Sequence, residues 1–184
     1  ARTLSDRSAS VQPGNRLQMP VVVNGFNDRS NGFVDPFPFR QEIEAASIKS
    51  DALTAPFPSW PAAVAPHELV HAAHAEIHAG LGIGGLVRTV APDWSRVINL
   101  TAPSGLIEGA AVYRESQLYA GAGRLHAPLA TMTYRAAMVS DDPWSLTQML
   151  EAPSYTRPFD RHYVGGGQAF AYLAAQDHTD APRF

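Results

Sequence analysis

The chain has 184 residues with 17 acidic and 14 basic side chains, no cysteine and a formal net charge of −3. This length fits one globular domain, and 45% hydrophobic residues against 17% charged ones supply enough apolar material for a core. The small negative charge, without a basic cluster, argues against a surface for nucleic acid or anionic lipid. The lack of cysteine excludes disulfides and thiolate metal sites, so a metal site would need His, Asp or Glu. The sequence contains no run of about 18 apolar residues, so it predicts no membrane span.

The first third of the chain carries the predicted β-structure. Residues 19–26 (MPVVVNGF) are a short β-rich run that predicts a buried strand. Residues 30–39 are rich in turn formers. Residues 40–46 fit either an exposed edge strand protected by its charges or a first helical turn, and we favour the strand. The prolines of residues 52–66 predict a loop with at most one helical turn.

The remainder is predicted to be helical. Pro66 fits the first turn of a helix that runs to about residue 79, with Gly80 as its stop. Further helices are expected at residues 106–119, 129–139, 144–151 and 167–176, separated by connections rich in Gly, Pro and Asp. A small β part followed by helices predicts an α+β fold in a single domain over residues 1–184.

The segment His67-Glu68-Leu69-Val70-His71 is an HExxH motif on the first predicted helix. Histidines four residues apart lie one above the other on a helix, so both imidazoles can bind one zinc ion. Glu68 would then lie beside the water on that ion. The alternative is a surface helix that happens to carry two histidines.

A catalytic zinc needs a third protein ligand, and Glu108 is the candidate. It lies in LIEGAAVYRES on the second predicted helix, 37 positions after His71. The small residues that follow it would let this helix pack closely against the first one. The alternative is a solvated glutamate near a helix N-terminus, where the helix dipole favours an acid.

Together, HELVH and IEGAAVY resemble the two zinc-binding motifs of the gluzincin metallopeptidases, the thermolysin-like group with HExxH and a downstream glutamate. The likeness extends to a bacterial set in which such a domain precedes a Tol-type β-propeller. It covers roughly residues 15 to 175 and includes VVVNGFNDRSNGF, HELVHAAH, LIEGAAVYRES, the Gly123-Arg124 turn and a Tyr-Gly segment. The resemblance implies a zincin fold, with one Zn²⁺ per chain bound by His67, His71 and Glu108. It also implies that Glu68 is the general base of peptide-bond hydrolysis.

Tyr163 precedes Val164-Gly165-Gly166, and this segment resembles the Tyr-x-x-Gly that supplies a phenol to the oxyanion in some gluzincin aminopeptidases. A phenol can donate there without carrying charge. His162 is the competing donor, because other gluzincins use an imidazole in this role. The alternative is a loop tyrosine that packs beside the glycines.

Spacing alone predicts a further feature behind the metal. His67, His71, His74 and His78 share one face of their helix, and Glu108 shares a face with Glu115. If the two faces oppose each other, Glu115 would lie near His74 or His78 and accept a hydrogen bond from one of them. A second metal site is the sharper version of this hypothesis. The alternative is that backbone carbonyls satisfy these histidines.

The substrate and setting are also inferred from the resemblance. The segment at Asn31-Gly32 and the strand after it resemble the edge that borders the gluzincin cleft, where an extended peptide adds by main-chain hydrogen bonds. No Gly-x-Met-Glu-Asn signature for a free amino terminus is present, which favours an endopeptidase acting on peptides or proteins. The chain is expected to be part of a longer, extracytoplasmic (periplasmic or secreted) protein that carries the propeller. The competing hypothesis is an inactive module of an envelope assembly that binds zinc or a peptide.

Overall fold

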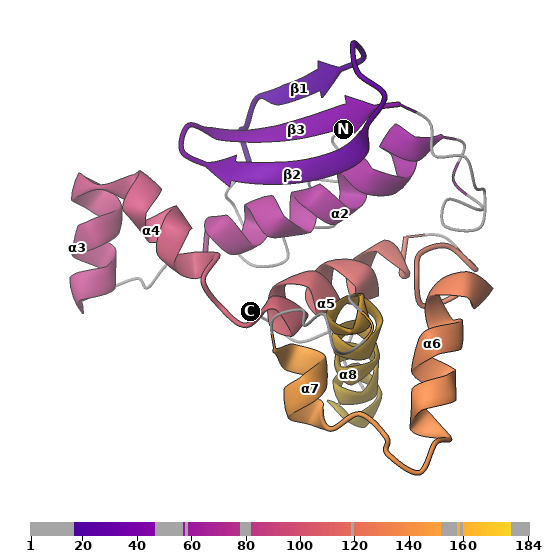
Figure 1. Ribbon diagram of the computed structural model, residues 1–184. Helices are drawn as coiled ribbons and strands as arrows, with labels where there is room; N and C mark the ends of the chain where they lie inside the picture. The colour runs from indigo at the N-terminus through magenta and orange to yellow at the C-terminus, as the bar shows by residue number, and fades with distance from the viewer. Residues whose placement is uncertain are drawn as a thin grey trace.

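The computed structural model describes residues 17–46, 57, 59–77, 82–118, 120–151, 158 and 160–177. Over these residues a small sheet is followed by helices, which confirms the predicted α+β class (Figure 1). The strands are β1 (Val21–Asn24), β2 (Ser30–Pro36) and β3 (Phe39–Ala45). Strand β1 lies in the run that was predicted to be a buried strand, but the predicted burial was wrong, because its three valines are exposed. The helices are α2 (Trp60–Ala75), α3 (Gly82–Val90), α4 (Pro92–Asn99), α5 (Ser104–Glu115), α6 (Pro128–Met138), α7 (Leu146–Leu150) and α8 (Arg161–Asp177).

The sheet has the order β1-β3-β2, with β1 parallel and β2 antiparallel to β3. Strand β3 is therefore central, and its expected position at an edge was wrong. Its alternating sequence explains the central position, because Gln41 and Ile43 are buried while Arg40 is only half-buried. The guanidinium of Arg40 pairs with neighbouring carboxylates, and its Nη1 lies 3.0 Å from Asp35. The charges thus belong to one face of a paired strand.

Strand β2 occupies most of the segment that was expected to form turns. It pairs with β3 along its whole length, and the turn between them lies at Phe37-Pro38. Pairing with β3 gives hydrogen-bond partners to backbone N–H and C=O groups of this segment, although its residue types favour turns. Within the described sheet, β2 is an edge strand, and it lies next to α2 (Figure 1).

Helix α2 begins at Trp60, six residues earlier than expected. Ser59 caps it by accepting a hydrogen bond from the backbone N–H of Ala62, and Pro61 lies in the first turn, where no N–H donor is needed. The helix continues through Pro66 and ends at Ala75, so the expected end at residue 79 was also wrong. Gly80 lies outside the described residues.

The helices α3 and α4 were not predicted. Both are tied to the end of α2 by Glu76, whose carboxylate lies 2.8 Å from Nη2 of Arg88 and 2.6 Å from Nε of Arg96. The Asn99 side chain adds a hydrogen bond to the carbonyl of Ala75. In Figure 1 the two helices stand to the side of the sheet and of the other helices.

Helices α5 and α8 pack against each other through their backbones. A Cβ atom on Gly109 would lie 2.4 Å from the carbonyl carbon of Gly166. Helix α8 begins at Arg161 rather than at residue 167, so its glycines lie inside the helix and do not open it. The adjoining apolar cluster is formed by Val70, Ala110, Ala111, Tyr113 and Phe170.

The other expected helices are present with shifted ends: α5 starts two residues earlier than predicted, α6 is displaced by one residue, and α7 is shorter. None of the helices in the described part of the chain is long and apolar enough to cross a membrane.

Candidate metal centre

The candidate site is formed where α2 meets α5. Helix α2 lies between the sheet and helices α5 to α8 (Figure 1). It contributes both residues of the histidine pair. Val70 faces the small residues Ala110 and Ala111 of α5 in one apolar cluster. Because small side chains separate the two helices here, Glu108 of α5 can reach the histidines of α2. The glycine after Glu108 was expected to pack on α2, but it packs on α8 instead.

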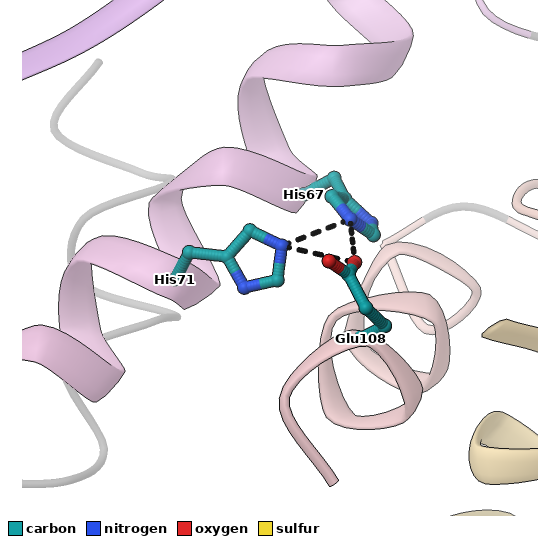
Figure 2. Close-up of side chains that lie close together, drawn as sticks. All are labelled: His67, His71 and Glu108. Atoms are coloured by element: carbon teal, nitrogen blue, oxygen red, sulfur yellow. Dashed lines mark hydrogen bonds and ion pairs between the residues drawn. The ribbon is translucent and has the colours of Figure 1, made fainter. Parts of the chain in front are cut away.

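Three potential ligand atoms converge at this place (Figure 2). The Oε2 atom of Glu108 lies 3.0 Å from His67 Nε2 and 3.2 Å from His71 Nε2, and the two nitrogens are 3.1 Å apart. Ligands placed about 2.0 Å from a tetrahedral zinc are about 3.3 Å from one another. The three atoms therefore form nearly the triangle that one such ion requires, and this buried group could hold a metal ion.

Charge reinforces the geometry. Burial alone would raise the pKa of Glu108, but the hydrogen bonds and charges of His67 and His71 outweigh it and hold that pKa far below its usual value. For His67, burial and the charge of Arg124 lower the pKa, but its contacts with the two glutamates outweigh them and raise it. Glu108 is therefore a carboxylate at neutral pH, which is the state that a metal ligand needs.

Glu115 supports His67 from behind. Its Oε2 lies 2.9 Å from His67 Nδ1, and the side chains of both residues are almost fully buried. With Nδ1–H donating to this carboxylate, Nε2 is the nitrogen of His67 that would bind a metal ion. Glu115 thus supports a histidine as predicted, but its partner is His67. The predicted partners were His74 or His78, and His78 lies outside the described residues.

Arg124 completes this corner of the site. The other oxygen of Glu115, Oε1, accepts a hydrogen bond of 2.9 Å from the backbone N–H of Arg124 and lies 3.3 Å from its Nε. Arg124 was not predicted from the sequence as a functional residue. The available signal was its place after Gly123, whose φ of 78° marks a turn that only glycine forms readily.

Glu68 lines the same pocket as the three candidate ligands and is 4% exposed. Burial raises the pKa of its carboxyl, against the lowering effect of the neighbouring histidines. No described protein group donates a hydrogen bond to its buried Oε2. Glu68 therefore has a hydrogen-bond acceptor available beside the candidate ligands, and its pKa is raised above the usual value for a glutamate.

Tyr163 lies in the first turns of α8, not in a loop. Its ring centroid is 6.1 Å from that of His67 and 4.8 Å from the Arg124 guanidinium carbon. Burial, and next the charge of Glu108, raise the pKa of the phenol to about 12, so it remains a neutral donor. Tyr163 lines the metal pocket, whereas His162 is 4% exposed and is not among the lining residues. The geometry therefore favours Tyr163 over His162 as the candidate oxyanion donor.

The pocket has a volume of about 460 Å³ and lies between β2 and the helices. Four consecutive residues of the edge strand line it: Asn31, Gly32, Phe33 and Val34. Leu100 and Ala102, which follow α4, lie on its wall as well. A cleft that is bordered by an edge strand can accept a chain in extended conformation.

His74 is buried beyond this group. Burial, and then the charge of His71, lower the pKa of His74 to about 4, and its ring centroid is 6.5 Å from that of His71. Among the described residues, the group whose potential ligand atoms lie close enough together to share one metal ion consists of His67, His71 and Glu108. The hypothesis of a second metal site at His74 finds no such group in the described part of the chain.

Comparison with protein families, with curated proteins and with solved structures finds no significant match to this chain.

Proposed function

We propose that this chain is a zinc-dependent metallopeptidase of the gluzincin type. The observation that carries the proposal is the convergence of His67, His71 and Glu108 beside Glu68 in one pocket. An HExxH helix that packs along a small sheet, with a glutamate contributed by a second helix, supports a zincin-like fold. The residue set accounts for each part of the chemistry.

The donor set fits zinc. Two imidazole nitrogens and one carboxylate form a common set of three protein ligands for a catalytic zinc, which keeps a fourth position open. His67, His71 and Glu108 would hold the ion. When bound, zinc supplies Lewis acidity and lowers the pKa of its water to about 7.

Glu68 moves the proton in this proposal. Its buried carboxylate accepts a proton from the water molecule that attacks the peptide carbonyl. It then delivers this proton to the leaving amine. The raised pKa of Glu68 supports both steps, because a general base works best when its pKa is near the working pH. The phenol O–H of Tyr163 donates a hydrogen bond to the oxygen on which negative charge develops, and the phenol keeps its proton.

The substrate is proposed to be a peptide or protein segment in extended conformation. It would pair with the outer edge of β2, where every second residue of the pocket-lining segment 31–34 turns its main-chain donor and acceptor away from β3. This pairing needs no free amino terminus. It therefore supports an endopeptidase rather than an aminopeptidase.

The test combines metal analysis with one substitution. The purified chain is expected to hold about one zinc per chain, because three ligands and a water complete its shell. Glu68→Gln is expected to keep the zinc and lose hydrolysis of a quenched-fluorescence peptide library. Glu151→Gln, at an exposed glutamate of the same chain, is the control. A chain without zinc would contradict the proposal. A parent chain that binds zinc but hydrolyses no peptide would also contradict it and would support the competing hypothesis of an inactive zinc- or peptide-binding module.

A further inference from the structure

Arg124 contacts residues on two sides of the metal centre. Toward one side, its backbone N–H and its guanidinium both engage Glu115, the carboxylate behind His67. Toward the other, the guanidinium lies over the ring of Tyr163, with its central carbon 4.8 Å from the ring centroid. The same guanidinium reaches within 3.5 Å of His67 Nδ1. One side chain thus links a residue that supports a ligand to the proposed oxyanion donor.

We propose that Arg124 is a positioning residue that fixes His67 and Tyr163 relative to each other. It acts on His67 through Glu115 and on Tyr163 through stacking. The inference rests on the proposed function for the identity of the metal, but the contacts that carry it are independent of any hydrolysis.

The Glu115 side of this link follows from burial. Glu115 is 3% exposed, and a carboxylate at such a depth needs partners on both oxygens. Its Oε2 faces His67, and Arg124 occupies Oε1. With Arg124 in place, the carboxylate cannot rotate without losing contacts at both ends. Outer partners of this kind typically change metal affinity by about 10-fold to 100-fold when they are removed.

The Tyr163 side follows from the nature of the guanidinium. A planar cation over an aromatic face attracts the ring and restricts its movement. Tyr163 extends from α8, whereas the ligands extend from α2 and α5. Arg124 lies on the connection between α5 and α6, so it joins the helix of Tyr163 to the ligand helices. Without it, the phenol would keep its helix but lose this fixed orientation.

The first experiment measures zinc affinity by competition with a chromogenic chelator. Arg124→Met keeps the backbone N–H that donates to Glu115 and removes only the guanidinium, so it is expected to weaken zinc binding by up to about 10-fold. Arg124→Lys keeps a cation for Glu115 and should retain most of the affinity. Arg135→Met, at an exposed arginine of α6, is the control and should leave zinc binding unchanged. Unchanged affinity in Arg124→Met would overturn this inference alone. Absence of zinc binding by the parent chain would overturn the proposed function with it.

A double-mutant cycle tests whether Arg124 acts through Glu115. Glu115→Gln should weaken zinc binding by itself. The double variant Arg124→Met with Glu115→Gln should bind zinc almost as tightly as whichever single variant has the lower zinc affinity. Because the double variant carries no unpaired buried charge, it also guards against a failure of Arg124→Met to fold. Losses that simply add would show that the two residues act separately, which would overturn this pathway.

The Tyr163 side is read by fluorine NMR on protein labelled with 3-fluorotyrosine. The resonance of Tyr163 is identified by its absence from Tyr163→Phe. Arg124→Met should shift this resonance, because the ring loses the cation over its face, and Arg124→Lys should restore it only partly. An unchanged resonance in Arg124→Met would show that stacking does not position Tyr163 and would overturn this half of the inference.

Discussion

Gly32 of β2 lies directly against the side chain of Glu68 in α2. A Cβ atom on Gly32 would be 3.0 Å from Cγ and 3.1 Å from Oε1 of Glu68, and 2.6 Å from Cγ2 of Val64. The spacing between the edge strand β2 and helix α2 is therefore set by the absence of one side chain. This places the proposed base next to the strand on which the substrate would lie.

Replacing Gly32 is therefore expected to disturb the base. In Gly32→Ala the new methyl group must push Val64 or Glu68 away, which should lower the free energy of unfolding by about 1–3 kcal/mol. Catalytic efficiency should fall further than stability explains, because Glu68 is displaced. Chemical unfolding and peptide hydrolysis measure the two effects. Gly25→Ala is the control, since a Cβ there meets nothing within 4 Å; equal effects in both variants would contradict the packing argument.

Zinc should stabilise the folded chain. At a free zinc concentration about 100 times its Kd, binding adds about 2.7 kcal/mol to the free energy of unfolding. Removal of the metal with a chelator should reverse this gain. Glu108→Gln should lose most of the zinc-dependent rise in Tm, because it removes the anionic ligand. The exposed variant Glu151→Gln should keep it. A full zinc-dependent rise in Glu108→Gln would exclude Glu108 as a ligand.

Tyr163→Phe should reduce turnover without loss of metal. Removal of one oxyanion donor commonly costs about 10²-fold to 10³-fold in kcat. KM and zinc content should stay close to those of the parent chain, since the ring and the ligands remain. Tyr172→Phe on the same helix, at a tyrosine 65% exposed, is the matched control. If kcat of Tyr163→Phe equals that of the control, the proposed donor is wrong.

The contribution of Glu76 to stability should depend on pH. Burial raises its pKa, but hydrogen bonds to Arg96 and Arg88 outweigh burial, so the pKa in the folded chain lies below its ordinary value of 4.5. The stabilisation is thus complete above that value and is lost as pH falls through the lowered pKa. Glu76→Gln should cost about 1–3 kcal/mol at pH 7. Urea unfolding at pH 7 and pH 3.5 should show a smaller difference from the parent chain at the lower pH, and a constant difference would disprove the pairing.

The local part of the site could be predicted from the sequence. The spacing of His67 and His71 fixes their common helix face whatever the fold, and a two-residue shift in the start of α5 does not change the face that carries Glu108. The partner of Glu115 could not be predicted, because it depends on the angle and offset at which α2 and α5 cross. The offset brings Glu115 to His67, although spacing alone pointed to the histidines further along α2.

The helix boundaries failed where glycine and proline stood inside elements. Ser59 followed by Pro61 is a good helix start, but the number of prolines nearby favoured a loop. In α8, glycines cost about 1 kcal/mol each in helix propensity, yet close packing requires them: Gly166 and Gly167 pack on α5, and Gly165 packs on Met149 of α7. Helix α3 carries Ile83, Leu86 and Val90 at helical spacing, a signal that the glycines before them obscured.

The contact between Gly109 and Gly166 has a consequence for how the site can vary. Because the two backbones touch there and the helices pack along an extensive contact, a relative shift of α5 and α8 would disrupt close packing along both of them. Glu108 and Tyr163 therefore belong to one rigid unit, while the histidines belong to α2. Since the proposed metal site also ties α2 to this unit, any adjustment of the pocket to a larger or smaller substrate would have to come from β2 or the segment after α4. Sequence variation that alters specificity should accumulate there and spare the two crossing helices.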